Sequence, residues 1–120
     1  MRYAALLFNT SDDWERWRGL TPEEAAAARA EEVPKWEALF GFVGPRWTAG
    51  YELGDPATAK VVRVRGGETQ ITDGPYAETK EVLGGLALLD CEHLDEAIEI
   101  ATRVPLVERG AVELRPIVEH

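Results

Sequence analysis

Residues 60–73 have the sequence KVVRVRGGETQITD, and this stretch predicts a β-hairpin. Two runs that alternate apolar and polar residues flank a central pair of glycines, which favours a two-residue turn. With that turn, Lys60 lies opposite Asp73, and Val62 lies opposite Ile71 on the same face. We expect this to be the inner face of a sheet.

The segments before the hairpin predict a strand, a helix and another strand. Tyr3–Phe8 is an unbroken apolar run typical of a buried strand. Thr21–Glu24 (TPEE) predicts a helix start, with a threonine N-cap, a proline at the first helical position and a capping-box glutamate. Pro34 should kink this helix or divide it in two, before it ends at Gly41–Pro45. Trp47–Leu53 alternates as a half-buried strand does.

The segments after the hairpin predict a strand, a helix and a last strand. Leu86–Leu89 is a second short apolar run. Leu94–Ala101 has the spacing of an amphipathic helix, with His93 where a cap residue is expected. Ala111–Val118 is the last strand, and Pro116 favours a position at the edge of the sheet.

The order of these elements, with one helix after the first strand and one before the last, predicts an α+β fold that forms one domain over residues 1–120. We expect a ferredoxin-like plait, with one antiparallel sheet and the helices on one face. The other face of such a sheet is apolar and uncovered. We therefore expect two chains to pair face to face as a homodimer.

Composition excludes several classes of protein. Acidic residues outnumber basic ones by 22 to 13, which gives a net charge of −9 and argues against general nucleic-acid binding and anionic membrane surfaces. Cys91 is the single cysteine, so no internal disulfide is expected. No apolar stretch approaches the roughly 20 residues of a membrane span, and we find no signal-peptide pattern. We expect a cytoplasmic protein with no metal and no cofactor, since neither metal-ligand spacing nor a phosphate-binding loop is present.

Residues 73–85 (DGPYAETKEVLGG) resemble the signature motif of the YCII-related family, in its DGPF branch, with Tyr76 in place of phenylalanine. Flanking features match in the same order, so the resemblance covers nearly the whole chain. It implies a ferredoxin-like fold in which two chains form a dimeric α/β barrel. Relatives of that fold include lyases, isomerases, a dehydrochlorinase and oxygenases, so no single reaction is implied. Many family members are encoded beside extracytoplasmic-function sigma factors, which are partners that only the resemblance suggests.

The motif contains two of the candidate catalytic residues, Asp73 and Lys80, and the third, Lys60, lies opposite Asp73 in the hairpin. Asp73 either accepts backbone hydrogen bonds in its own turn or acts as a general acid or base beside Lys60. Glu78 and Lys80 either form an exposed ion pair or line a pocket. The Tyr76 hydroxyl either contacts a ligand or points into water.

Three tryptophans are further candidates for substrate binding. Trp14 and Trp17 are three residues apart, so one helical turn would place them side by side. They form either a hydrophobic cap or an aromatic wall at the mouth of a cavity. Trp47 is either part of the core or the floor of that cavity.

The leading hypothesis is a cofactor-independent enzyme that binds a small organic molecule between the open sheet face and the loops. Asp73 would transfer a proton, assisted by Lys60 and Lys80, in an isomerisation, elimination or decarboxylation. Tyr76 and Glu78 would contact the substrate. The alternative is a non-catalytic binding or regulatory dimer, with a sigma factor as a partner by family analogy.

Overall fold

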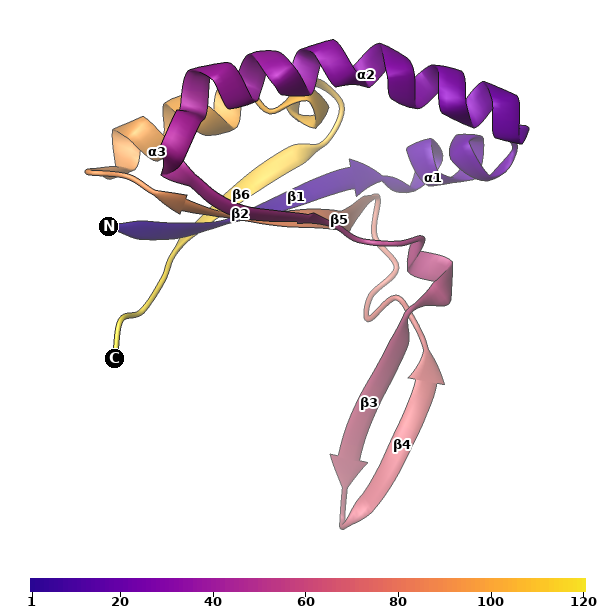
Figure 1. The fold of residues 1–120 in the computed structure, drawn as a ribbon. Coiled ribbons are helices and arrows are strands. Elements are labelled where there is room, and N and C mark those ends of the chain that lie inside the picture. The colour runs from indigo at the N-terminus through magenta and orange to yellow at the C-terminus, as the bar shows by residue number, and fades with distance from the viewer.

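The computed structural model describes residues 1–120 and has the α+β architecture that the sequence predicts (Figure 1). Three short 3-10 turns, at residues 44–46, 56–58 and 105–108, connect the longer elements. No helix is both long enough and apolar enough to cross a membrane. In chain order the elements are β1 (Arg2–Thr10), α1 (Ser11–Arg18), α2 (Pro22–Val43), β2 (Trp47–Glu52), β3 (Lys60–Arg65), β4 (Glu68–Asp73), β5 (Glu81–Asp90), α3 (Leu94–Thr102) and β6 (Ala111–Pro116).

The main sheet has the strand order β2-β5-β1-β6, and all its neighbouring strands are antiparallel. All three α-helices lie over the same face of this sheet (Figure 1). This arrangement confirms the ferredoxin-like plait. It also confirms the edge position expected for the strand that contains Pro116.

The core lies between the main sheet and the helices. Tyr3, Ala5 and Leu7 alternate along β1 and are buried on the helix side of the sheet. Leu39 from α2 and Ile100 from α3 pack into the same cluster. The intervening residues of the central strands are only half-buried because nothing covers the other side. We call this side the open face; it is formed by Ala4, Leu6, Phe8, Leu83, Leu86 and Leu88.

Helix α2 begins with the predicted capping box. The Thr21 hydroxyl accepts a hydrogen bond from the Glu24 amide at 3.2 Å, and the Glu24 carboxylate accepts one from the Thr21 amide at 3.0 Å. The hydrogen bond from the Thr21 amide is the main cause that lowers the pKa of Glu24. The expectation of a helix divided at Pro34 is wrong, since α2 is continuous for 22 residues. Pro34 is exposed, so water can satisfy the carbonyl that its missing N–H leaves free.

Strands β3 and β4 form the predicted hairpin, in the predicted register from Lys60 opposite Asp73 to Arg65 opposite Glu68. Gly66 and Gly67, with φ of 58° and 80°, make the two-residue turn. The hairpin does not join the main sheet, however. It forms a separate two-stranded sheet that projects on the open-face side, and we call it the hairpin arm (Figure 1).

The expectation that Lys60 and Asp73 lie on an inner face is wrong for the single chain, where their side chains are 64% and 81% exposed. The reason is topological. Strands β2 and β5, on either side of the hairpin in sequence, pair directly with each other. The segment between them leaves the sheet after β2, pairs with no strand of that sheet, and loops outward before β5.

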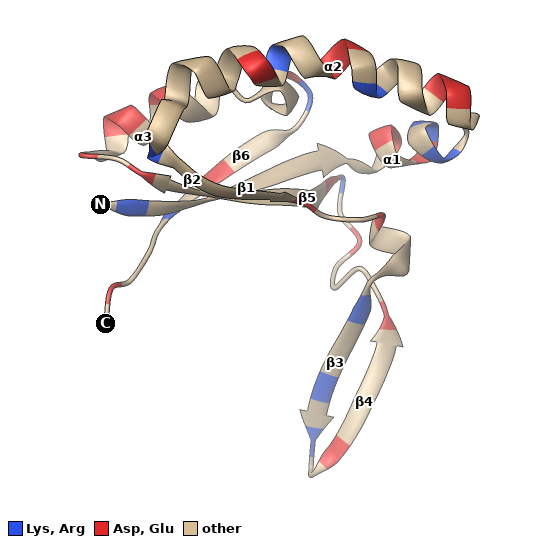
Figure 2. Ribbon diagram, in the orientation of Figure 1, with Lys and Arg blue, Asp and Glu red and all other residues tan.

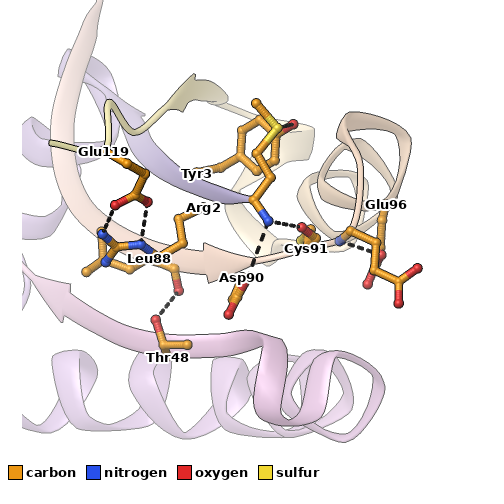
Figure 3. Close-up of polar contacts among 10 residues, drawn as sticks. Arg2, Tyr3, Thr48, Leu88, Asp90, Cys91, Glu96 and Glu119 are labelled. Carbon is orange, nitrogen blue, oxygen red and sulfur yellow. Dashed lines mark hydrogen bonds and ion pairs between the residues drawn. The ribbon is translucent and has the colours of Figure 1, made fainter.

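The chain ends meet beside the central strands (Figure 3). Arg2 donates two hydrogen bonds to the Glu119 carboxylate, at 2.8 and 2.7 Å, and the Ile117 amide donates to the Arg2 carbonyl at 2.9 Å. The segment that follows β6 then runs toward the open-face side (Figure 1). Cys91 is buried as a small core residue, and burial raises the pKa of its thiol.

Candidate functional site

A cavity of about 560 Å³ lies where the hairpin arm leaves the plait. Its walls come from residues 53–61, which lead into β3, from residues 75–83, which follow β4, and from Phe8 at the end of β1. Half of the lining residues are hydrophobic. We call it the arm-base cavity. The predicted family motif thus supplies a large part of one wall.

A close backbone contact places the motif against the opposite wall. The Gly74 amide donates a hydrogen bond to the Ala59 carbonyl at 2.8 Å. A Cβ atom at Gly74 would lie only 2.8 Å from the Ala59 Cβ, which is closer than such atoms approach in proteins. Glycine is therefore required here, and it brings Pro75 and Tyr76 to the cavity wall.

Lys60 and Asp73 form the ion pair that the hairpin register predicts. The Lys60 ammonium donates a hydrogen bond to an Asp73 carboxylate oxygen. Lys60 lines the arm-base cavity, whereas Asp73 lies behind it at the end of β4. Lys60 therefore lies at the cavity itself, and Asp73 is joined to the cavity only through its hydrogen bond with Lys60.

Tyr76 is held at the mouth of the cavity by the hairpin arm. The Arg63 guanidinium lies 5.4 Å from the centre of the Tyr76 ring, in cation–π geometry. The tyrosine lines the arm-base cavity but is 79% exposed. Its hydroxyl is therefore available to a ligand at the cavity entrance.

An ion pair that sequence reasoning missed fixes the base of the hairpin arm. Arg18, the last residue of α1, donates two hydrogen bonds to the Asp55 carboxylate, at 2.7 and 2.6 Å. Asp55 also accepts a hydrogen bond from the Ala57 amide at 2.8 Å. The Arg18 hydrogen bonds, followed by that from Ala57, lower the pKa of Asp55 to about 2. Asp55 is thus a fixed anion in the cavity wall, and it lies 37 positions from Arg18 in the sequence, too far for a local sequence pattern to indicate the pair.

A second cavity, of about 580 Å³, opens at the ends of β1, β5 and β6. Lys80, Glu81 and Glu113 line it with Phe8, so Phe8 stands between the two cavities. The predicted catalytic residue Lys80 therefore lies in a different cavity from Lys60. Its carbonyl accepts a hydrogen bond from the Ser11 amide at 2.8 Å, which ties the motif to α1.

Glu78 is exposed on the loop between the two cavities and lines neither. The ion pair with Lys80 that the sequence allowed does not form.

The structure places the three candidate tryptophans away from both cavities. Trp14 and Trp17 lie on α1, and the Arg29 guanidinium of α2 sits 5.0 Å from the centre of the Trp17 ring. Trp47 packs beneath α2 in an aromatic cluster, with its ring centre 5.4 Å from that of Phe40. This position corresponds to the core alternative for Trp47.

The whole length of the chain, residues 1–120, matches the family described as the YCII-related domain. The chain belongs to the YCII-related family. An uncharacterised protein of Rhizobium meliloti (strain 1021) is 33% identical to this YCII-related chain over 119 residues, which is 98% of this chain and 92% of the relative. The similarity therefore extends over the plait and the hairpin arm alike.

The site of this YCII-related chain also contains residues that the sequence did not single out. Phe8 seemed to be an ordinary residue of a buried strand, yet it borders both cavities. Val82 and Leu83 lie within the motif without being predicted site residues, yet both line the arm-base cavity. Nowhere in the chain do three or more His, Cys, Asp or Glu side chains gather in a way that could hold a metal ion.

Proposed function

We propose that this YCII-related protein, a member of the DGPF branch, binds a small organic molecule in the arm-base cavity. The observation that carries this proposal is the coincidence of motif and cavity. Pro75, Tyr76 and Ala77 line a space of about 560 Å³, within the range of small-molecule sites. A segment whose role was only to reverse the chain direction would not need to form the wall of a cavity.

The lining favours a mainly apolar ligand with one polar group. Phe8, Leu53 and Leu83 supply apolar surface, and Lys60 supplies a cation. The ammonium of Lys60 has donors beyond the one used by Asp73, so it can bind a carbonyl or carboxylate oxygen of the ligand. The lining contains two carboxylates, Asp55 and Glu81, and that of Asp55 is already neutralised by Arg18.

We further propose that the bound molecule undergoes a proton-transfer reaction. Lys60 would hold the ligand oxygen and pass on the proton that Asp73 accepts or returns, which suits an isomerisation, elimination or decarboxylation. The 81% exposure of the Asp73 side chain favours the second candidate, a non-catalytic binding or regulatory protein. Lys80 would assist from the neighbouring cavity, and a sigma-factor partner stays a family-based hypothesis. We propose the cytoplasm as the location.

We also propose that the functional unit is a homodimer. The open face presents the apolar residues Leu6, Leu86 and Leu88 with no helix over them. Two such faces can cover each other, as the sequence predicts.

Filling the arm-base cavity tests ligand binding. The probe is 1-anilinonaphthalene-8-sulfonate, a small aromatic anion, and binding is measured by its fluorescence. We expect Leu83→Trp to weaken binding at least about tenfold, because the indole occupies the cavity. The control is Leu94→Trp, which places the same side chain at an exposed position on α3. Equal binding by the two variants would refute the arm-base cavity as the site.

Measuring turnover then distinguishes the two candidate functions, an enzyme and a non-catalytic binding or regulatory protein. Small carboxylic acids that displace the probe are incubated with the wild type and with Asp73→Asn, and product formation is measured. A reaction that disappears in Asp73→Asn supports proton transfer, whereas binding without any turnover in the wild type supports the non-catalytic protein.

A further inference from the structure

The hairpin arm has one mainly polar face and one apolar face. On one face Arg63 contacts the Tyr76 ring. The other face presents Val62, Val64 and Ile71, which are 62%, 59% and 67% exposed. An apolar surface of this kind is uncommon on a strand pair that faces only water.

A two-stranded hairpin without a packing partner is marginally stable at best in water. Here neither strand of the arm pairs with the main sheet, and each has six residues. The sequence nevertheless specifies the hairpin strongly, through its alternation and its glycine turn. The arm therefore has the features of an element that is stabilised by packing on another surface.

The accessible surface and the radius of gyration of the single chain indicate how much surface a partner could bury. The accessible surface is 8279 Å², whereas a compact monomer of this mass exposes about 6,500 Å². The excess of roughly 1,800 Å² is what each partner buries in a large homodimer interface. The radius of gyration, 16.5 Å, also exceeds the value of about 14 Å expected for 120 residues.

Charge favours a second copy of this chain as the partner. The hairpin arm carries three of the 13 basic residues and two of the 22 acidic ones, so it is slightly positive while the remainder is strongly negative. Lys60, Arg63 and Arg65 all lie on β3 (Figure 2). A positive arm that reaches across another acidic copy reduces the repulsion between the two chains.

The hairpin arm is long enough to reach a second copy of the chain that packs on the open face. A strand of six residues spans about 20 Å, whereas two sheets packed face to face are about 10 Å apart. The arm projects on the open-face side of its own sheet (Figure 1). It can therefore extend across the gap to the sheet of a partner that packs there.

We infer that the hairpin arm crosses to a second copy of this chain and packs Val62, Val64 and Ile71 on the open face of that copy. This inference rests on the homodimer in the proposed function and specifies its geometry. Because residues 59–61 at the root of the arm line the arm-base cavity, the partner fixes one wall of each site. Ligand binding and dimerisation are then thermodynamically linked, so each strengthens the other.

The test compares Ile71→Asp with Gln70→Asp in the full-length protein. Both changes place the same charge on neighbouring residues of β4, but only Ile71 is on the apolar face. Sedimentation equilibrium measures the dimer dissociation constant. We expect Ile71→Asp to raise it about 100-fold, tenfold for each of two symmetric positions, and Gln70→Asp to change it by less than about threefold.

Ile71→Asp could weaken the dimer by unfolding the arm, so a second test uses hydrogen exchange of the wild type. We expect the backbone amides of β3 and β4 to be protected in the dimer and to lose that protection on dilution. A dimer whose arm amides exchange freely, or whose dissociation constant is unchanged in Ile71→Asp, overturns arm exchange and leaves the face-to-face dimer standing. A wild type that is monomeric at every concentration overturns both, and binding of 1-anilinonaphthalene-8-sulfonate to that monomer then reports on the arm-base cavity separately.

Discussion

The ion pair between Lys60 and Asp73 distinguishes a free hairpin arm from a docked one. In the single chain the two side chains are 64% and 81% exposed. Exposed pairs of this kind contribute about 0–1 kcal/mol to stability. The arm can also open while the plait stays folded, because its strands pair only with each other. We therefore expect a coupling free energy below about 0.5 kcal/mol between the two side chains in the monomer.

Docking should strengthen this coupling. The pair lies on the same face of the arm as Val62 and Ile71, so a partner that covers this face removes water from the pair. A fall in the effective dielectric constant from about 80 to about 20 raises the attraction at 4 Å from about 1 to about 4 kcal/mol. Desolvation offsets part of the gain, which leaves an expected coupling of about 1–2 kcal/mol in the dimer.

A double-mutant cycle measures the coupling. Urea unfolding of the wild type, Lys60→Met, Asp73→Asn and the double variant is followed by tryptophan fluorescence, since all four tryptophans lie in the plait. The cycle is repeated below and above the dimer dissociation constant, and again at high salt. Equal coupling at the two protein concentrations would refute the argument, as would a coupling above about 2 kcal/mol in the monomer.

Two further predictions concern the framework of the site. Gly110→Ala should destabilise the protein by more than about 2 kcal/mol in urea unfolding, because its Cβ would lie 1.8 Å from the Phe8 carbonyl oxygen. Gly41→Ala is the matched control and should stabilise by about 0.5–1 kcal/mol, since it is helical and its Cβ meets nothing within 4 Å. Because the folded-state pKa of Asp55 is lowered to about 2, its stabilising effect should be full above the unfolded pKa of about 4 and lost as pH falls toward 2. The difference in melting temperature between wild type and Asp55→Asn should therefore be constant above about pH 5 and shrink toward pH 2, and a difference that grows on acidification would contradict the Arg18 pairing.

Local chemistry made much of this fold predictable from sequence. The capping box of α2 depends only on Thr21 and Glu24, and the hairpin register depends only on alternation about two glycines. Pro34 was expected to kink or divide its helix because its ring and its missing N–H disturb a helix interior. Its cost depends on whether water reaches the freed carbonyl, and that is a property of the packed molecule.

Long-range pairing made the rest unpredictable. The outward position of the hairpin arm follows from the direct pairing of β2 with β5, which no pattern within the arm records. The Arg18–Asp55 pair likewise joins α1 to the base of the arm across a gap in sequence. Both features shape the arm-base cavity. The sequence therefore indicated the motif that lines the site but not the elements that fix its geometry.

The exposure of Asp73 connects the proposed chemistry to the proposed assembly. A carboxylate that is 81% exposed is hydrogen-bonded to water. These water molecules compete with the substrate group that would exchange a proton with the carboxylate. The partner that covers the apolar face of the hairpin arm also covers the Asp73 end of that face. Proton transfer at this residue should therefore require the dimer, and turnover per chain should rise with protein concentration in proportion to the dimer fraction. Turnover per chain that is equal in the monomer and the dimer would place the reacting group elsewhere in the cavity.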